Sequence, residues 1–427
     1  MIKKENNFDI AVIGAGPAGM MATGRAAELG ARVILIEKNK KPGRKLLLAG
    51  KGRCNITNAE FNLRKLVENY GKNGKFLFRA FSVFGPKDVI DFFEKLGLKT
   101  KIERGKRVFP FSDKSEDVLK ALIKYLIKNK VNIIYNSEVI GISHQNRKIK
   151  KLILKNGEIV AKNYIFCTGG KSYPLTGSTG DGFKWANDLG HHIKELSPAL
   201  VPIKTKENWV KELQGLSLKN VEISVFQKDP APEQARYGAG KKQCSEFGEC
   251  LFTHFGLSGP IILDISKKVG ELLRNGRVKI SLDLKPALDF AKLDQRVQKD
   301  FKKYQNKSFK NCLNDLLPRR LIPIIVKLSD IGPEKKVNSI AKEERHNLVK
   351  LLKNLEMTAE GLLGFNFAIV TSGGISLQEI DDKTMKSKMI DNLFFAGEII
   401  DIDGPTGGFN LQNCWSTGYL AGENAVK

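Results

Sequence analysis

The sequence predicts an α/β protein in which both ends of the chain build one parallel sheet and a separate region is inserted between them. Three observations support this. Residues 8–37 have the pattern strand, Gly-rich turn, helix, strand, acid. Residues 393–422 run from an apolar strand through a second Gly-rich turn into a helix that begins near Asn410. Between them, residues 199–285 have strand patterns and residues 288–356 have amphipathic helical patterns, which is how an inserted domain appears in a sequence.

We therefore expect four segments along the chain. The domain with the parallel sheet has its first part at residues 1–196 and its second part at residues 357–427. An inserted β-rich domain spans residues 197–287, and its strands include the segment IILDIS. An inserted helical segment spans residues 288–356. A length of 427 residues is large for a single core, which agrees with more than one domain.

The composition, 41% hydrophobic and 27% charged, is that of an ordinary globular protein. We find no apolar run approaching the ~18 residues of a membrane-spanning helix and no signal-peptide pattern, so we expect a cytoplasmic protein without a membrane segment. The six cysteines are scattered and include no C-x-x-C pair. This predicts neither a metal site nor a disulfide framework.

The net charge is +25, and a strongly basic balance is typical of proteins that bind nucleic acid. However, Lys supplies 55 of the 71 basic residues, and these residues are spread along the chain. Nucleic-acid sites tend to favour Arg for its bidentate and stacking geometry. We therefore do not expect a nucleic-acid partner. The oligomeric state is not predicted.

A G-x-G-x-x-G motif opens the first helix directly after the first strand. Gly14 permits the tight turn, Gly16 lets the backbone approach a diphosphate, and Gly19 lets helix and strand pack closely. The helix N-terminus supplies N–H groups and a positive dipole. Glu37 ends the next strand, where it accepts ribose hydroxyls and repels a 2′-phosphate. The motif predicts an ADP moiety, which belongs to FAD or NAD.

Two further segments favour FAD. The Thr-Gly-Gly turn at residues 168–170 follows a buried strand and resembles the ATGG turn of flavoproteins with two dinucleotide-binding domains. Glu398 takes the place of the acid that holds the ribitol of FAD. The helix near Asn410 would direct its N-terminus at the N1/C2=O edge of the flavin and stabilise the negative charge of the reduced ring.

The longer segments GRKLLLAGKGRCNITN, RVFPFSDKSEDV, FTHFGLSGPIILDIS, TSGGISLQEIDDKTMKSK and FFAGEIIDIDGPTGGFNLQ together resemble the HI0933-like flavoprotein family. This family includes the BaiN-type and aminoacetone-oxidase-type NAD(P)/FAD-dependent oxidoreductases. The resemblance covers essentially the whole chain in the same order. It implies a Rossmann-like FAD-binding domain of the two-dinucleotide-binding-domain type, with an inserted β-barrel-like plus helical domain.

The resemblance also implies which residues contact FAD. They are Gly14, Ala15, Gly16, Pro17, Ala18, Glu37, Arg44, Arg53, Cys54, Asn55, Thr168, Gly169, Gly170, Gly397, Glu398, Asp401, Gly408, Phe409, Asn410 and Leu411. The chain departs from the family at Lys51, where many members have Gly. The sequence leaves open whether this cation lies near the flavin or the substrate or points to solvent.

Cysteine and histidine residues are the remaining candidates for chemistry. Redox exchange between Cys54 and the flavin needs a second cysteine close by in sequence, and none is present, so we favour a packing role. His254 is the candidate for proton transfer, because His titrates near neutral pH and two glycines flank it. A structural role for His254 is the alternative. His191 and His192 follow a helix end and predict a cap more than a metal pair.

These observations predict an FAD-dependent oxidoreductase that moves a hydride through flavin N5 between a small organic substrate and NAD(P)H or oxygen. No second G-x-G-x-x-G unit exists, so NAD(P)H would bind transiently, in the cleft between the FAD and inserted domains. Two alternatives remain. One is a flavin-dependent tRNA-modifying enzyme of the GidA or TrmFO type, and the other is a redox-sensing flavoprotein without turnover. The sequence does not distinguish NADH from NADPH, or an oxidase from a reductase.

Overall fold

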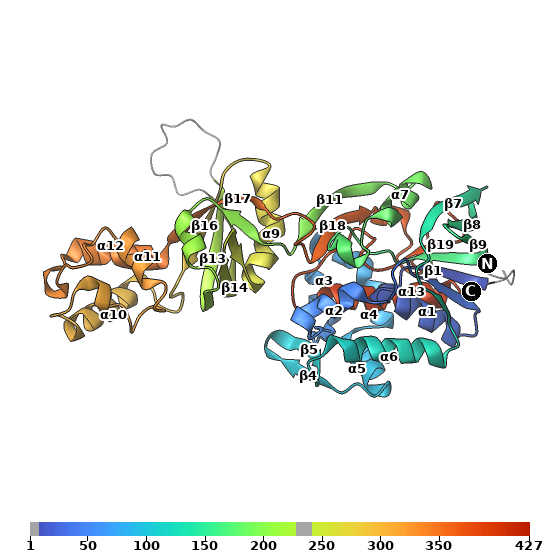
Figure 1. Cartoon of the computed structure of the whole chain (residues 1–427), viewed down its shortest axis with the longest axis horizontal. Coiled ribbons are helices and arrows are strands. Elements are labelled where there is room, and N and C mark those ends of the chain that lie inside the picture. Colours follow the sequence, from blue (N-terminus) through green and yellow to red (C-terminus); the bar gives the residue numbers. More distant parts are fainter. Residues whose placement is uncertain (1–7, 228–240) are drawn as a thin grey trace. The chain divides into compact units, whose positions relative to one another are not determined.

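The computed structural model describes residues 8–227 and 241–427, and it divides into two compact units (Figure 1). Unit 1 contains residues 1–199 and 365–427, and unit 2 contains residues 200–364. Each unit has its own cluster of buried apolar side chains. None of the helices in the described ranges has the length and hydropathy that a membrane-spanning helix needs.

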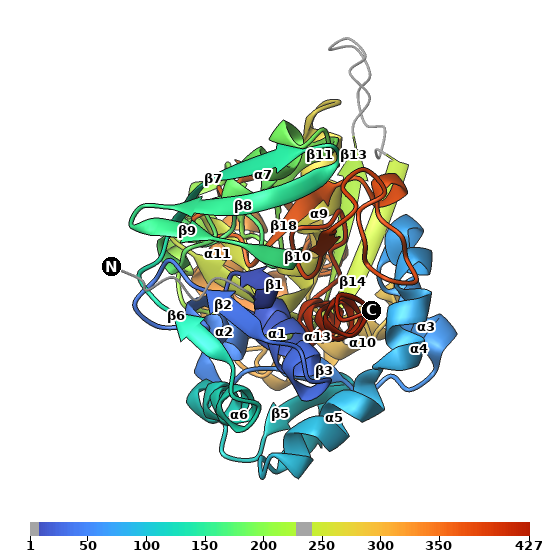
Figure 2. The same cartoon turned by 90° about the vertical axis from the view of Figure 1, so that its right-hand side faces the viewer.

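Unit 1 is built on a five-stranded parallel sheet (Figure 2). Its strands, in spatial order, are β19 (Leu393–Phe395), β10 (Ala161–Phe166), β1 (Phe8–Ile13), β2 (Val33–Ile36) and β6 (Asn132–Ile134). Strands β1 and β2 are buried along most of their length, as expected for a parallel sheet covered on both faces. The structure therefore confirms the predicted Rossmann-like domain made from both ends of the chain.

Helices and small sheets surround the parallel sheet of unit 1. The helices are α1 (Pro17–Glu28), α2 (Arg44–Leu48), α3 (Leu63–Glu68), α4 (Phe78–Val83), α5 (Pro86–Lys95), α6 (Ser115–Lys128), α7 (Asp181–Asp188) and α13 (Phe409–Asn424). The small sheets are β3 (Thr57–Asn58), β5 (Arg107–Pro110) and β4 (Thr100–Glu103); β7 (Val139–Gln145), β8 (Lys148–Leu154) and β9 (Gly157–Ile159); and the pair β11 (Ile193–Ala199) and β18 (Val370–Ile375).

The first and last helices of the chain pack against each other through a glycine seam. A Cβ atom at Gly418 would lie 2.5 Å from the carbonyl oxygen of Ala18, and one at Gly422 would lie 2.3 Å from that of Ala22. These distances are far below van der Waals contact, so α13 can approach α1 this closely only because both positions lack a side chain. The seam fixes the C-terminal helix beside the helix that follows the G-x-G-x-x-G turn.

Unit 2 contains a closed six-stranded barrel, which confirms the predicted β-barrel-like insertion. Around the barrel the strands are β12 (Ile203–Thr205), β15 (Gly256–Ser258), β14 (Lys241–Thr253), β13 (Ser217–Gln227), β16 (Val278–Asp283) and β17 (Leu355–Leu362). Along β13 the side chains of Val221, Ile223 and Val225 are buried at every second position. This alternation places one face of the strand in the barrel interior.

The segment IILDIS, which we expected to be a strand, is helical. It lies in α9 (Pro260–Leu273), which follows α8 (Asn208–Glu212) among the described helices of unit 2. Its apolar residues are too closely spaced to distinguish the periodicity of a helix from that of a strand. Pro260, in the first turn of the helix, is a helix start signal. The buried positions Ile261, Ile265 and Leu272 follow helical spacing.

Three helices complete unit 2: α10 (Phe290–Lys303), α11 (Ile322–Leu328) and α12 (Lys342–Lys353). Asp289 caps α10 by accepting a hydrogen bond from the backbone N–H of Lys292 at 2.8 Å. Arg345 of α12 donates to the carboxylate of Asp294 on α10, with Nε to Oδ1 at 2.8 Å. Apolar side chains of both helices, including Leu293 on α10, belong to the buried cluster of unit 2.

Candidate FAD-binding site

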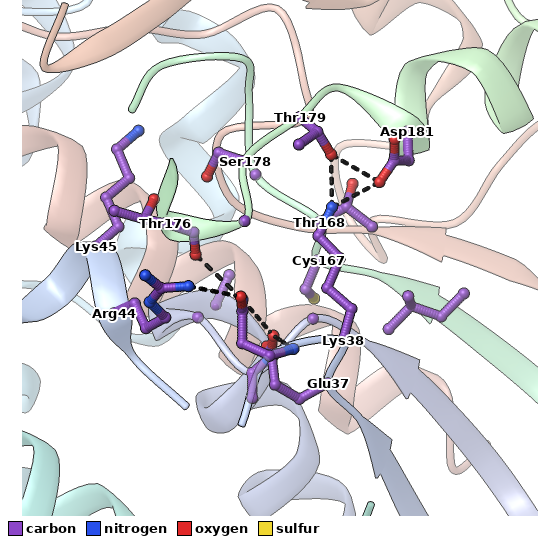
Figure 3. A pocket seen from close by; sticks show the side chains of 18 of the residues that line it. Glu37, Lys38, Arg44, Lys45, Cys167, Thr168, Thr176, Ser178, Thr179 and Asp181 are labelled. Atoms are coloured by element: carbon purple, nitrogen blue, oxygen red, sulfur yellow. Dashed lines mark hydrogen bonds and ion pairs between the residues drawn. The ribbon is translucent and has the colours of Figure 1, made fainter. Parts of the chain in front are cut away.

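A pocket of unit 1 lies at the carboxyl ends of the parallel strands (Figure 3). Its lining includes Ile13, Ile36, Cys167 and Ala396, which end or directly follow β1, β2, β10 and β19. Ligands of doubly wound α/β folds bind at this edge of the sheet. Half of the predicted FAD contacts line the pocket: Gly14, Ala15, Gly16, Pro17, Ala18, Glu37, Arg44, Thr168, Gly169 and Glu398.

The three glycines of the first turn differ in what a side chain would meet at their positions. Gly14 has φ +100°, and a Cβ there would lie 2.5 Å from the carbonyl oxygen of Cys167. A Cβ at Gly19 would lie 1.8 Å from the carbonyl oxygen of Gly14. Gly16 is different, because a Cβ there would have no atom of the described residues within 4 Å and its backbone is extended. Packing does not require Gly16 to be glycine, so its missing side chain leaves room for a ligand.

Glu37 is buried at the tip of β2 and shapes the wall of the pocket. Its Oε2 accepts a hydrogen bond from the backbone N–H of Ala15 at 2.8 Å. Its Oε1 accepts from the backbone N–H and the side-chain amide of Asn39, at 2.8 and 2.7 Å. The carboxylate is thus oriented by the Gly-rich turn on one side and by Asn39 on the other. Arg44 donates to Asn39 Oδ1 at 2.9 Å, which brings its guanidinium to the same wall (Figure 3).

A second group of polar residues in the pocket was missed from the sequence. Lys38 Nζ lies 2.6 Å from Asp181 Oδ2 and 2.5 Å from Thr179 Oγ1, and Thr179 Oγ1 also donates to Asp181 at 2.7 Å (Figure 3). Asn39 donates its amide to the carbonyl of Thr176 at 3.1 Å. The segment Thr176-Gly-Ser-Thr-Gly-Asp181 is rich in turn-forming residues, and this pattern could have identified it as a loop beside the cofactor.

Glu398 also lines the pocket and is held by two groups. Its Oε1 accepts the backbone N–H of Thr371 at 2.8 Å. Lys45 donates to both carboxylate oxygens, at 3.0 and 2.7 Å, and it was not among the predicted site residues. A Cβ at Gly170 would lie 2.8 Å from Glu398 Oε1. The Thr-Gly-Gly turn, which contains Gly170, and helix α2 therefore position the carboxylate predicted to hold ribitol.

The remaining ten predicted contacts do not line this pocket within the described part of the chain. They are Arg53, Cys54, Asn55, Gly170, Gly397, Asp401, Gly408, Phe409, Asn410 and Leu411. Helix α13 begins at Phe409 after Gly408, whose φ is +100°. A Cβ at Gly408 would lie 2.4 Å from the backbone of Thr57. The Asn410 side chain bonds Gly404, with its Oδ1 accepting from the N–H at 2.9 Å. Gly408, the N-cap residue of α13, gives the first N–H groups of the helix no side-chain cap.

Arg53, Cys54 and the nearby Lys51 differ strongly in their surroundings. Arg53 donates to Glu103 and Asp113, with Nη2 at 2.5 and 2.6 Å from them, so its charge is compensated within the protein. The hydrogen bond from the Arg53 guanidinium lowers the pKa of Glu103, whereas the nearby Asp113 carboxylate acts in the opposite direction. Cys54 is fully buried, and this burial raises the pKa of its thiol well above the ordinary value. Lys51 is exposed.

Several features of the described residues fit a bound FAD. Asn55 Oδ1 and Thr168 Oγ1 are buried and have no hydrogen-bond partner among the described residues, and a buried polar atom without a partner costs free energy. Thr168 lines the pocket, so a hydroxyl or ring atom of the cofactor would satisfy it. Gly16 leaves space where a diphosphate would approach the N-terminus of α1. The unpaired hydroxyl of Thr168, the space at Gly16 and the dipole of α1 together fit a bound dinucleotide.

The histidines have separate locations. His254 is exposed in the turn between β14 and β15 of unit 2, with its ring 4.8 Å from that of Phe255. His191 is buried in unit 1, where its Nδ1 lies 3.3 Å from Glu379 and its Nε2 lies 3.0 Å from Ser387 Oγ. No group of three or more His, Cys, Asp and Glu side chains suited to a metal ion occurs within residues 8–227 and 241–427.

Comparison with known proteins gives concordant results along the whole chain. The family model of the HI0933-like protein Rossmann domain matches residues 8–424. The chain is 29% identical over 422 residues to the 3-dehydro-bile acid delta(4,6)-reductase of Clostridium scindens, covering 98% of this chain and 99% of that protein. It is 30% identical over 421 residues to the ribosomal RNA dihydrouridine synthase of Escherichia coli, covering 98% of each.

Solved structures share the fold at low sequence identity. The chain aligns with a 3-ketosteroid-delta4-(5alpha)-dehydrogenase from Rhodococcus jostii at a TM-score of 0.54 and 15% identity, covering 100% of this chain and 98% of that one. A flavocytochrome c3 fumarate reductase aligns at a TM-score of 0.52 and 16% identity, covering 99% and 78%. The name of the Escherichia coli relative weakens our expectation that nucleic acid is not a partner.

Proposed function

The chain belongs to the HI0933-like family and is an FAD-dependent oxidoreductase, and from this premise we propose that it reduces the C5=C6 bond of uridine in ribosomal RNA. This proposal names a substrate and a reaction direction that the sequence left open. It also replaces the small organic substrate that we expected from the sequence.

The proposal rests first on the chemistry that two relatives share. A delta(4,6)-reductase of a 3-dehydro bile acid acts on carbon–carbon double bonds conjugated with a ketone, as its name states. A dihydrouridine synthase saturates C5=C6 of uracil, which is conjugated with the C4 carbonyl. Both reactions deliver a hydride to a carbon–carbon double bond that is conjugated with a carbonyl, and a proton completes the saturation of that bond. A chain related to both along its full length fits the same reaction type.

The charge of the chain is the observation that favours RNA over a steroid. A net charge of +25 attracts a polyanion at long range and contributes sequence-independent affinity for phosphates. A bile acid carries a single carboxylate and gains much less from such a surplus. The excess of Lys over Arg does not oppose this, because lysine binds phosphates as a point charge.

The residues of the pocket would hold the cofactor in defined roles. Bound FAD would supply a hydride at its N5 atom. Glu37 would accept the ribose hydroxyls of the ADP end, and Glu398, oriented by Lys45, would accept those of the ribitol. The N-terminus of α13 would stabilise negative charge at the pyrimidine edge of the ring. These interactions hold and poise the cofactor.

The reaction balances with a nicotinamide as the reductant. One hydride goes to uracil C6 and one proton to C5, while NADH or NADPH is oxidised to NAD⁺ or NADP⁺. We retain His254 as the proposed donor of the proton, because it is an exposed imidazole beside a glycine turn. His254→Asn should then slow formation of dihydrouridine without changing the FAD content or the rate of flavin reduction by the nicotinamide.

The test is an anaerobic reaction of the purified protein with unmodified rRNA transcripts and either NADH or NADPH. The RNA is digested to nucleosides, and dihydrouridine is quantified by mass spectrometry. We expect product with at least one nicotinamide. A third sample reduced with dithionite separates a wrong donor from a wrong substrate. Absence of dihydrouridine in all three samples, with FAD bound, rejects the proposed substrate.

A second candidate is the reduction of a small enone, which the Clostridium scindens relative favours. The same reduced protein is mixed with a steroid 4-en-3-one, and the loss of its conjugated ultraviolet absorbance is followed. Turnover of the enone without turnover of RNA would select this candidate. Hydrogen peroxide formation in air, measured without either substrate, tests the oxidase alternative.

A further inference from the structure

Unit 2 carries a group of lysines in the last turns of α10 and in the segments that follow it. Figure 1 shows α10 in unit 2. We call this group of lysines the basic edge. Its members are Lys299, Lys302, Lys303, Lys307, Lys310 and Lys336. All six side chains are exposed. The twelve residues 299–310 contain five lysines and one acidic residue, Asp300. Asp300 is buried and pairs with Arg296 at 3.0 Å.

Backbone contacts hold the basic edge in one place. Ser308 forms a β-bridge with Lys336, and the N–H of Val337 donates to the carbonyl of Lys307 at 3.1 Å. The Lys336 ammonium donates to the carbonyl of Asn306 at 3.3 Å. These bonds join two segments that are about 30 residues apart in the chain. The lysines therefore share a surface through the fold and not only through sequence proximity.

A tyrosine ring organises the centre of the basic edge. The Nζ atoms of Lys303 and Lys307 lie 5.0 and 4.6 Å from the ring centroid of Tyr304, within the range of cation–π contacts. Tyr304 and Lys303 both donate to Asp315 Oδ2, at 2.7 Å each. The Tyr304 ring thus holds the ammonium groups of Lys303 and Lys307 close together. Asp315 neutralises Lys303 but not Lys307.

The charge of the basic edge is only partly compensated. Lys303 pairs with Asp315, and Lys310 pairs with Glu334. Lys299, Lys302, Lys307 and Lys336 form no ion pair with any residue that the structure describes. Lysines in the last turn of a helix favour its dipole, which accounts for Lys302 and Lys303. It does not account for Lys307, Lys310 or Lys336, because they lie outside α10.

We propose that the basic edge is a docking surface for the phosphate backbone of structured RNA. Like charges held together raise the free energy of the free protein, and a polyanion removes this cost by displacing counterions. No large hydrophobic side chain is exposed among residues 291–336. An acidic amphipathic peptide or a membrane surface would require such apolar contacts, whereas a phosphate backbone requires only the cations.

The inference rests on the proposed function and assigns RNA docking and uridine selection to different parts of the protein. Lysines that contact phosphates position an RNA without reading its bases. The basic edge would therefore dock the RNA with little regard to sequence, and the choice of uridine would belong to the flavin site. Duplex RNA suits this surface, because its recognition depends on backbone and shape.

The test compares two triple variants of the full-length holoprotein. K302E/K307E/K336E reverses three of the four uncompensated charges of the basic edge. The matched control, K124E/K128E/K150E, reverses three exposed lysines of unit 1 and changes the net charge equally. Binding of a fluorescently labelled rRNA hairpin transcript is measured by anisotropy over a series of salt concentrations. FAD content and circular dichroism establish that both variants are folded.

We expect the basic-edge variant to bind the hairpin at least about tenfold more weakly, with a salt slope reduced by about 2 to 3, since each phosphate contact contributes about 0.7 to 0.9. The control should stay within about twofold of the wild type. Equal weakening of both variants, or no RNA binding by the wild type, overturns the inference. Dihydrouridine formation is measured separately: its absence in the wild type rejects the proposed function, whereas selective loss of hairpin binding still supports the docking surface.

Discussion

Lys45 and Glu398 are 353 positions apart in the chain, yet the Lys45 ammonium lies 2.7 Å from Glu398 Oε2 and 3.0 Å from Oε1. Both side chains are mostly shielded, with 23% and 16% of their surfaces exposed. The pair joins helix α2, near the start of the chain, to the segment after β19, near its end. One contact thus connects two parts of the pocket lining that come from the two ends of unit 1 in the sequence.

Removal of the Lys45 ammonium should weaken FAD binding. In Lys45→Met the Glu398 carboxylate loses a cation in a partly desolvated site, and a charged hydrogen bond contributes about 1.5 to 3 kcal/mol. We expect the Kd for FAD to rise about tenfold or more, measured by fluorescence titration of the apoprotein. Lys124→Met, on the exposed face of α6, is the matched control and should bind as the wild type does. An unchanged Kd in Lys45→Met would remove this pair from the cofactor site.

Gly16 and Gly19 should respond differently to the same substitution. Gly16→Ala adds a methyl group that meets no described atom within 4 Å, so the free energy of unfolding of the apoprotein should stay near that of the wild type. The same methyl group would occupy the diphosphate space and raise the Kd for FAD at least about tenfold. Gly19→Ala places a methyl group 1.8 Å from the carbonyl oxygen of Gly14, and it should destabilise the fold itself by about 1 to 3 kcal/mol or more.

Urea unfolding of the apoproteins and FAD titration separate the two effects of these glycine variants. A Gly16→Ala protein that binds FAD normally would show that the cofactor does not approach this turn. A Gly19→Ala protein of normal stability would contradict the packing reason for the third glycine.

The Cys54 thiol should be chemically silent in the native protein. Complete burial raises its pKa well above the ordinary value, so it stays protonated and out of reach at pH 8. Iodoacetamide should modify the half-buried Cys244 first and Cys54 only after denaturation, as measured by peptide mass spectrometry. Cys54→Ala should retain flavin reduction by the nicotinamide. Loss of that reduction in a folded, FAD-bound Cys54→Ala protein would instead support the redox role.

Burial of His191 predicts a pH-dependent stability. Desolvation lowers the pKa of His191 below 6.5, although the nearby Glu379 acts in the opposite direction. Below pH 6.5 the unfolded chain therefore binds a proton that the folded protein does not, and stability falls as the pH decreases. Urea unfolding at pH 7.5 and pH 5.5 should show this loss, and His191→Gln should reduce it. His144→Gln, at an exposed position of β7, is the control and should leave the pH dependence unchanged.

The sequence predicts the parts of the fold that depend on local spacing. The turn with Gly14, Gly16 and Gly19 could be identified because each glycine has a fixed offset from a strand and a helix. Residues 261–266 show the limit of this reasoning. Their isoleucines have a high strand propensity, but Pro260 starts a helix whose apolar face packs in unit 2. Tertiary packing decides such a segment, and propensity alone does not.

The site was predictable where one motif contains all its parts and not where distant segments meet. Glu37 and the Gly-rich turn belong to one motif, and the structure joins them by a hydrogen bond from Ala15. Lys45 could not be assigned, because its partner is at the far end of the chain. The same holds for Lys38 and Asp181, whose contact depends on how β2 and α7 are placed around the sheet.

The glycine seam between α1 and α13 has a consequence for biosynthesis. A ribosome synthesises α1 long before its partner α13, because the two helices lie far apart in the chain. Unit 2 is one continuous segment and has all its residues available earlier, so it can fold while unit 1 still waits for its final helix. FAD would then bind only after α13 has been synthesised. A variant truncated before Gly418 should therefore fail to retain FAD, which the flavin absorbance of the purified protein would show.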